Sequence, residues 1–135
     1  MKAPVWIEER DALAIHERLL GLHGGAAGLR DRGLLESALA RPRQYHAYAS
    51  AGQRDIIAMA ALYAAGIIRN HPFLDGNKRT GFVVSVLFLE LNGYQFTASE
   101  EESVHAVIAL AAGTLDEDGF AAFLRAHVKV RRTRS

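Results

Sequence analysis

Hydrophobic residues along the chain recur mostly at the spacing of a helix. Between residues 7 and 22 apolar positions are interrupted by charged ones, and this pattern predicts an amphipathic helix. Residues 55–70 and 76–91 are apolar on nearly every side, which predicts two buried helices at the centre of the fold. Further segments with a helical pattern cover residues 32–40, 99–112 and 116–128.

Capping residues mark where several of these helices begin or end. Asp31 is the predicted N-cap of the helix at 32–40, and Pro42 lies just beyond the expected end of that helix. Ser99 and Glu102 have the spacing of a capping box, in which each side chain binds the other residue's backbone N–H. Asp116 or its neighbour caps the last helix. These local signals support a chain of consecutive helices.

The segments between helices predict little other regular structure. Residues 41–53 are polar and aromatic and predict an ordered loop or flap, while residues 94–96 predict a brief extended piece. No repeat, low-complexity tract or linker divides the 135 residues. We therefore predict an all-α fold with a single domain over 1–128, followed by a disordered basic tail at 129–135.

Composition excludes several classes of protein. The chain has no cysteine, so disulfides, thiolate zinc sites and cysteine nucleophiles are absent, and we expect a cytoplasmic protein. The longest strongly apolar run, 81–89, is too short to span a bilayer, so no membrane partner is expected. A formal net charge of +1 lacks the excess of Lys and Arg typical of nucleic-acid binders, so no direct nucleic-acid partner is expected either.

A polar loop between the two buried helices carries the candidate chemistry. A glycine-containing loop supported by apolar helices on both sides is a rigid platform for a site. The segment Gly76-Asn77-Lys78 begins the second buried helix, where unpaired backbone N–H groups and the helix dipole favour an anion. Gly76 allows close approach, and Lys78 and Arg79 add positive charge suited to a polyphosphate.

Two residues of this loop have side chains suited to catalysis. Asp75 is a hard oxygen ligand of the kind that holds Mg²⁺ together with substrate phosphates, although an aspartate here also suits helix capping. His71 ends a helix beside the predicted phosphate site, and an imidazole is suited to accept a proton from a hydroxyl. The remaining histidines lack such neighbours and are predicted to be structural: His16, His23, His46, His105 and His127.

Other catalytic motifs are missing from the sequence. There is no His-Glu-x-x-His helix, no Gly-x-x-x-x-Gly-Lys-Ser/Thr loop, no Gly-x-Gly-x-x-Gly turn and no Gly-x-Ser-x-Gly elbow. A zinc hydrolase built on His71 and Asp75 would need a third close ligand, and no adjacent histidine supplies one.

The loop resembles the motif of the Fic/Doc family. The family pattern is His-Pro-Phe-x-Asp/Glu-Gly-Asn-Gly-Arg with a second Arg further on, and residues 71–79 read His-Pro-Phe-Leu-Asp-Gly-Asn-Lys-Arg. Residues 28–42 are similar to the N-terminal region of death-on-curing (Doc) toxins. Lys78 replaces a family glycine and Phe82 replaces the final arginine, and both departures resemble the Doc branch rather than AMP-transferring Fic enzymes.

The resemblance implies a fold, a reaction and partners. Family members are helical, with the motif between two central helices. By resemblance, the chain would bind ATP and Mg²⁺ and transfer the γ-phosphoryl group to a threonine of elongation factor Tu, which arrests translation. A Phd-like antitoxin would be its partner. The implied roles are His71 as base, Asp75 as the Mg²⁺ ligand, Asn77, Lys78 and Arg79 as phosphate-binding residues, and Arg69 as an assisting cation.

Two alternatives to this function stay open at the level of sequence. The same loop could transfer AMP rather than a phosphoryl group to a protein hydroxyl. It could also belong to a non-catalytic module that binds an anion or a protein, with His71 in a structural role.

Overall fold

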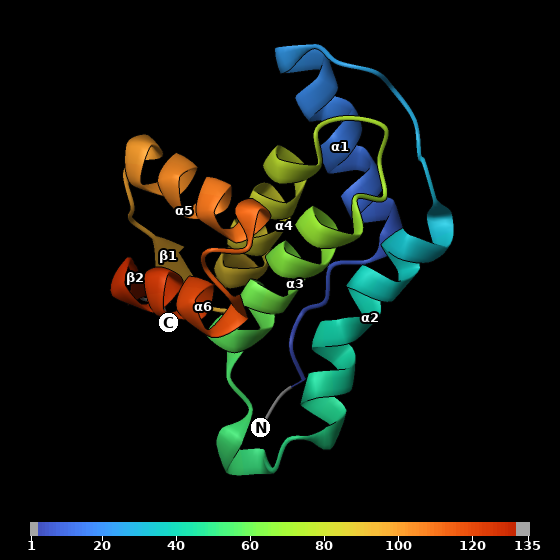
Figure 1. Ribbon diagram of the computed structural model, residues 1–135. Coiled ribbons are helices and arrows are strands. Elements are labelled where there is room, and N and C mark those ends of the chain that lie inside the picture. The colour runs from blue at the N-terminus through green and yellow to red at the C-terminus, as the bar shows by residue number, and fades with distance from the viewer. Residues whose placement is uncertain (1–2, 132–135) are drawn as a thin grey trace.

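Helices make up most of the computed structural model, which describes residues 3–131 (Figure 1). The elements in chain order are α1 Glu9–His23, α2 Arg32–Tyr48, the 3₁₀ helix η1 Ala51–Gln53, α3 Ile56–Asn70, α4 Asn77–Leu91, β1 Tyr94–Phe96, α5 Glu100–Ala112, α6 Glu117–Ala126 and β2 Val128–Val130. The predicted all-α class is confirmed, with one small two-stranded sheet added to it.

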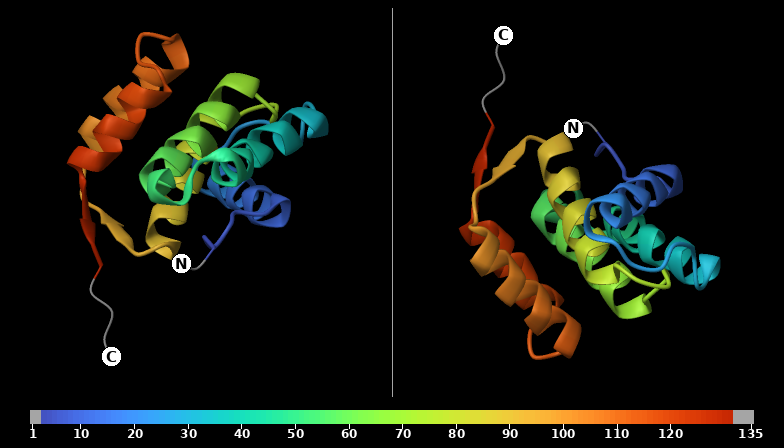
Figure 2. Two further views of the ribbon diagram at one scale, coloured as in Figure 1. Left: turned by 90° about the horizontal axis from the view of Figure 1, so that it is seen from below. Right: turned by 90° about the horizontal axis from the view of Figure 1, so that it is seen from above.

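Helix α3 is the centre of the molecule. As the apolar sequence predicted, most of its side chains are buried, and it contacts α2, α4, α5 and α6. Figure 2 shows α5 and α6 as a pair on one side of the other helices. Glycines allow the close approach: a Cβ on Gly66 would lie 3.1 Å from the Cα of Ala38 in α2, and one on Gly81 would lie 2.8 Å from Cγ1 of Ile68 in α3. The contacts of α3 with α2 and α4 therefore leave no room for a side chain at these two positions.

The predicted caps are present. Asp31 accepts a hydrogen bond from the backbone N–H of Leu34, and Asp116 accepts one from Gly119. Ser99 and Glu102 form the reciprocal capping box at the start of α5. These bonds satisfy N–H groups that a helix cannot pair internally, so they fix where α2, α5 and α6 begin.

Helix α2 is longer than the sequence predicted. The prediction of a loop over 41–53 is wrong in its first part, because α2 continues through Pro42 to Tyr48. A proline inside a helix removes one backbone hydrogen bond and costs about 3 kcal/mol. Pro42 is nevertheless buried on the same face of α2 as Leu35 and Ala38, toward α3, and this packing offsets the local cost.

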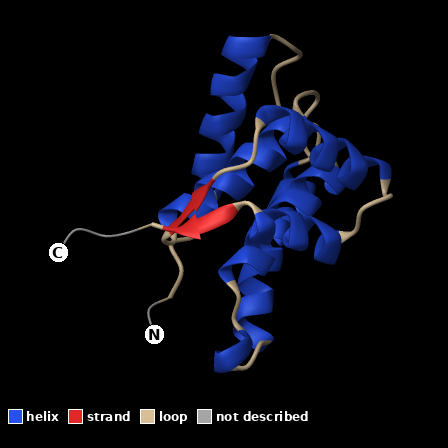
Figure 3. Ribbon diagram, turned by 90° about the vertical axis from the view of Figure 1, so that its left-hand side faces the viewer, coloured by secondary structure: helices blue, strands red, loops and turns tan. Residues whose placement is uncertain are grey.

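The small sheet changes the prediction for the C-terminal tail. β2 pairs antiparallel with β1, with Tyr94 opposite Val130, and the N–H of Arg131 donates to the carbonyl of Gly93 at 2.8 Å. Figure 3 shows the two strands in red. The prediction that the tail is disordered from residue 129 onward is therefore wrong at the start of the tail, while residues 132–135 lie outside the described residues.

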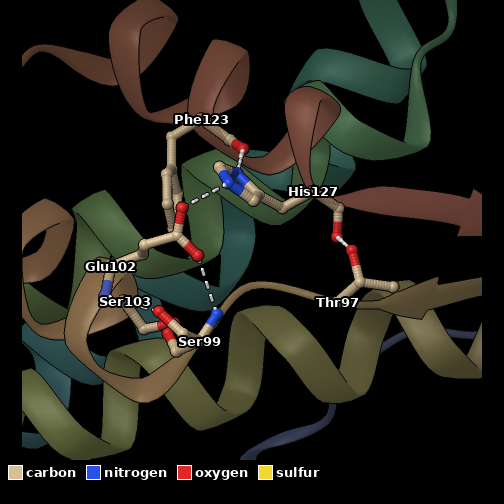
Figure 4. A network of polar contacts seen from close by, with 6 residues as sticks. All are labelled: Thr97, Ser99, Glu102, Ser103, Phe123 and His127. Carbon is tan, nitrogen blue, oxygen red and sulfur yellow. Dashed lines mark hydrogen bonds and ion pairs between the residues drawn. The ribbon is translucent and has the colours of Figure 1, made fainter.

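A network around His127 joins this sheet to α5 and α6 (Figure 4). Nδ1 of His127 donates to the carbonyl of Phe123 at 2.8 Å, and Nε2 lies 3.1 Å from Glu102. The bond to Phe123, followed by the one to Glu102, raises the pKa of His127. The backbone and side chain of Ser99 hold the pKa of Glu102 below its usual range. The network thus ties the C-terminal end of α6 to the start of α5.

None of the helices in the described range combines the length and the apolar character that crossing a membrane requires.

Candidate active site

His71 stands at the C-terminal end of α3 in an unusual backbone conformation. Its φ of 54° and ψ of 53° are left-handed, and it is the one non-glycine residue with positive φ in the described part of the chain. Its N–H donates to the carbonyl of Ile67 at 3.1 Å, and Pro72 follows and ends the helix. A left-handed non-glycine residue costs about 1–3 kcal/mol, so neighbouring contacts must hold it. The residue itself is exposed.

Asn77 fixes the shape of the loop from inside. Its side chain accepts the N–H of Phe73 at 2.9 Å and donates to the carbonyl of Phe73 at 3.0 Å. Both residues are buried. The amide of Asn77 therefore points into the protein, and the predicted phosphate contact from this side chain is not supported. Its place in the first turn of α4 leaves its backbone N–H as the group suited to an anion.

The segment between α1 and α2 supports the loop from outside. Leu29 forms an isolated antiparallel bridge with Phe73, and the N–H of Leu74 donates to the carbonyl of Gly28 at 3.0 Å. His16 of α1 stacks on Phe73 with ring centroids 3.8 Å apart, and its Nε2 lies 2.8 Å from the carbonyl oxygen of Asp75. Because a carbonyl only accepts, Nε2 carries the hydrogen in this contact. His16 is structural, as predicted, but it supports the loop directly.

The start of α4 faces a cleft of about 730 Å³. Gly76 precedes the helix with φ 80°, which favours glycine, and Lys78 and Arg79 lie exposed in the first turn. Among the described residues neither Lys78 nor Arg79 forms an ion pair. His71 and Asp75 line the same cleft. The structure therefore brings the predicted base, the predicted metal ligand and two free cations together.

An apolar wall of this cleft comes from α4, β1 and α5. Its side chains include Phe82, Val86, Phe96, Val104 and Ile108. Val104 and Ile108 are 47% and 55% exposed, which is high for aliphatic residues. The cleft thus combines a cationic end with an apolar wall, an arrangement suited to a ligand with both characters.

Asp75 has one weakly engaged carboxylate oxygen. Oδ1 accepts the N–H of Gly76 at 2.8 Å, while Oδ2 accepts the N–H of Ala26 at the long distance of 3.3 Å. The side chain is exposed at the cleft, so its oxygens suit a hard cation that also binds phosphate oxygens. No group of three or more His, Cys, Asp or Glu side chains within residues 3–131 forms a complete metal site.

Arg69 is not among the residues that line this cleft. Its guanidinium lies 3.5 Å from Glu117, the first residue of α6, and 3.4 Å from the carbonyl of Leu115, just before α6. Arg41 of α2 pairs with the same Glu117 at 2.6 Å. The last turn of α3 directs Arg69 toward Glu117, and the assisting role implied by its position near His71 in sequence stays a prediction.

Comparison with known proteins identifies the family. A profile described as the Fic/DOC family matches residues 6–89, a span that includes α1, the loop and most of α4. The chain belongs to the Fic/DOC family. It is 30% identical over 119 residues to the protein named "Protein kinase doc" of Escherichia phage P1, which covers 88% of this chain and 92% of the relative. It is also 40% identical over 75 residues to the "Toxin Doc" of Mycolicibacterium smegmatis, covering 56% and 57%.

These relatives agree with the resemblance found in the sequence. The predicted Fic/Doc membership and Doc type are confirmed, and the predicted enzyme class is confirmed at the level of a homologue named a protein kinase. Sequence reasoning located the loop and its exposed groups correctly. It missed the support from His16 and from the side chain of Arg30, whose partners lie far away along the chain.

Proposed function

We propose that this chain is a Doc-type toxin that transfers the γ-phosphoryl group of ATP to a threonine hydroxyl of elongation factor Tu in the cytoplasm. The observation that carries the proposal is the cleft itself. His71, the N-terminal turn of α4 and the cations Lys78 and Arg79 all line it, in a chain with a kinase relative over 88% of its length. Phosphoryl transfer requires mainly alignment and neutralisation of charge, which these groups supply.

In the proposed reaction His71 is the base. An imidazole nitrogen accepts the hydroxyl proton as the threonine oxygen attacks the γ-phosphorus. The bond between that phosphorus and the oxygen bridging to the β-phosphate breaks, and ADP leaves with the bonding electron pair. His71 then releases the proton to solvent. The products are phosphothreonine, ADP and one proton, so charge and atoms balance.

The remaining groups of the cleft bind the nucleotide. Phosphate oxygens accept from the free N–H groups of the first turn of α4 and from the cations Lys78 and Arg79. Gly76 lets the phosphates approach the backbone closely, and the apolar wall accommodates the rest of the nucleotide. Asp75 would hold Mg²⁺ through its exposed carboxylate, and the ion would neutralise phosphate charge when bound.

We further propose that a Phd-like antitoxin binds over this cleft. One relative is named a toxin, and the exposed Val104 and Ile108 on α5 provide apolar surface at the rim of the cleft.

Labelled ATP tests the reaction. Purified protein is incubated with elongation factor Tu, Mg²⁺ and ATP labelled at either the α- or the γ-phosphate, and label on the factor is counted. We expect γ label only, lost in His71→Ala and retained in His105→Ala, because His105 is an exposed histidine of α5 outside the cleft. Label from the α-phosphate would replace the proposal with AMP transfer. γ label on another protein of a lysate, but none on elongation factor Tu, would refute the target and keep the reaction.

A further inference from the structure

The side chain of Arg30 reaches the end of α3 from the segment between α1 and α2. Its Nε donates to the carbonyl of His71 at 2.7 Å, and its terminal NH2 donates to the carbonyl of Asn70 at 2.9 Å. The last carbonyls of a helix have no partner within it and carry partial negative charge. A guanidinium that binds two of them at once therefore makes charge-assisted bonds with a fixed geometry.

The backbone beside Arg30 continues the same contact. The N–H groups of Arg30 and Asp31 both donate to the carbonyl of Pro72, at 2.7 and 3.0 Å. The three successive carbonyls of Asn70, His71 and Pro72 are thus all bound by two neighbouring residues. In Figure 1 this cyan segment lies beside the loop that joins α3 to α4.

The residue in the middle of this contact is the one with a left-handed backbone. At φ 54° the chain would relax to a more favourable region if its carbonyl were free to rotate. The hydrogen bond from Arg30 to that carbonyl opposes such a rotation. Because the backbone angles of His71 set the direction in which its Cβ leaves α3, they also set the direction of its imidazole.

We propose that Arg30 is a positioning residue for His71: by binding the carbonyls of Asn70 and His71 it holds the left-handed backbone that directs the imidazole into the cleft. The part concerning catalysis rests on the proposed function of His71. Lysine would not replace Arg30, because one ammonium lacks the planar pair of donors that binds two adjacent carbonyls.

Three variants test this role. Arg30→Ala removes both side-chain bonds, and Arg30→Lys keeps the charge without the paired donors. Arg32→Ala is the matched control, because Arg32 lies two residues away and, among residues 3–131, its side chain binds only Glu9 of α1, at 3.0 and 2.6 Å. Circular dichroism first establishes that all three variants are folded.

The first readout does not depend on enzymatic activity. Backbone and imidazole resonances of His71 are compared by NMR between the wild type and each variant. We expect large changes at Asn70 and His71 in Arg30→Ala, smaller ones in Arg30→Lys, and none in Arg32→Ala. Resonances of His71 that stay unchanged in Arg30→Ala would overturn the proposal, whether or not the protein transfers phosphate.

The second readout is the rate of γ-label transfer. We expect kcat to fall about 10- to 100-fold in Arg30→Ala with little change in the KM for ATP, because misplacing a reacting group by about 1 Å has an effect of this size. Millimolar guanidinium should restore part of kcat in Arg30→Ala and none in His71→Ala. An equal loss in Arg30→Ala and Arg32→Ala, or a higher KM at unchanged kcat, would contradict a positioning role. A wild type without activity would refute the proposed function and leave the NMR result to decide on Arg30.

Discussion

Replacing Asn77 by alanine should lower the stability of the protein, because the side chain of Asn77 holds the loop from inside and is not expected to contact phosphate. Asn77 is 3% exposed, and its side chain makes two hydrogen bonds, at 2.9 and 3.0 Å, to the N–H and carbonyl of a single residue, Phe73. Phe73 itself is fully buried. Alanine offers neither a donor nor an acceptor, so both backbone groups of Phe73 would stay buried without a partner.

The magnitude follows from these two groups. A buried polar group left without its partner costs about 1–3 kcal/mol, so the two together predict a loss of about 2–6 kcal/mol in the free energy of unfolding. The free energy of unfolding of a small domain is about 5–15 kcal/mol, and it falls by about 1–3 kcal/mol for each molar of urea. With a urea dependence of about 2 kcal/mol per M, the urea midpoint of Asn77→Ala should therefore fall by about 1–3 M.

Urea unfolding followed by circular dichroism measures this change, and Asn70→Ala is the matched control. Asn70 is only half-buried, and its side chain makes one hydrogen bond, 2.9 Å to the carbonyl of Leu34. The free energy of unfolding of Asn70→Ala should fall by about 1 kcal/mol. A variant Asn77→Ala as stable as the wild type, but with weaker ATP binding, would refute the reasoning. That result would instead mean that the amide contacts phosphate.

Three further predictions concern other parts of the molecule. Thr80→Val should raise the free energy of unfolding by about 1 kcal/mol in urea titrations, because the buried Oγ1 has no hydrogen-bond partner within the described residues; a less stable variant would contradict this. His127→Gln should destabilise the protein in a pH-dependent way. The raised pKa of His127 stabilises the fold fully below its ordinary pKa of 6.5, and this stability is lost as the pH rises through the pKa of His127 in the folded protein. The lowered pKa of Glu102 stabilises the fold above its ordinary pKa of 4.5, and this stability is lost as the pH falls through the pKa of Glu102 in the folded protein. The urea midpoints of wild type and variant should therefore differ most between pH 4.5 and 6.5, and a difference independent of pH would exclude this network as the cause. Gly25→Ala should raise the Mg²⁺ concentration needed for half-maximal transfer about 10-fold, because a Cβ there would lie 2.7 Å from Oδ2 of Asp75. If the Mg²⁺ concentration needed stays the same, Asp75 does not hold the metal through this oxygen.

Local sequence patterns predicted most of the helices and the position of the loop. The period of apolar residues indicated that α3 and α4 are buried, and Asp31, Ser99 and Asp116 indicated three helix starts. These signals are reliable because a cap and its partner lie within a few residues, so the hydrogen bond forms whatever the rest of the fold does. The run from His71 to Arg79 indicated the family for the same reason: all its residues are adjacent in sequence.

Other features depended on packing between distant segments. The local preference of Pro42 predicted the end of α2 near residue 40. Burial of Pro42 on the face toward α3 instead allows the helix to continue to Tyr48. Arg69 is close to His71 in sequence, but the turn of α3 directs it toward α6. Asn77 has a polar side chain in a polar loop, and only the buried position of Phe73 decided that it faces inward. In each case a tertiary contact overrode a correct local preference.

The sequence by itself thus determined the helical class, the caps and the chemical groups of the loop, since each of these depends on residues within one or two helical turns. Only the tertiary structure decided how those groups are held. The partner of the Asp75 carbonyl, His16, is 59 residues away, and the partner of the His71 carbonyl, Arg30, is 41 residues away. Such pairs leave no periodic signal in one chain, because their meeting depends on how α1 and the segment before α2 pack against the end of α3.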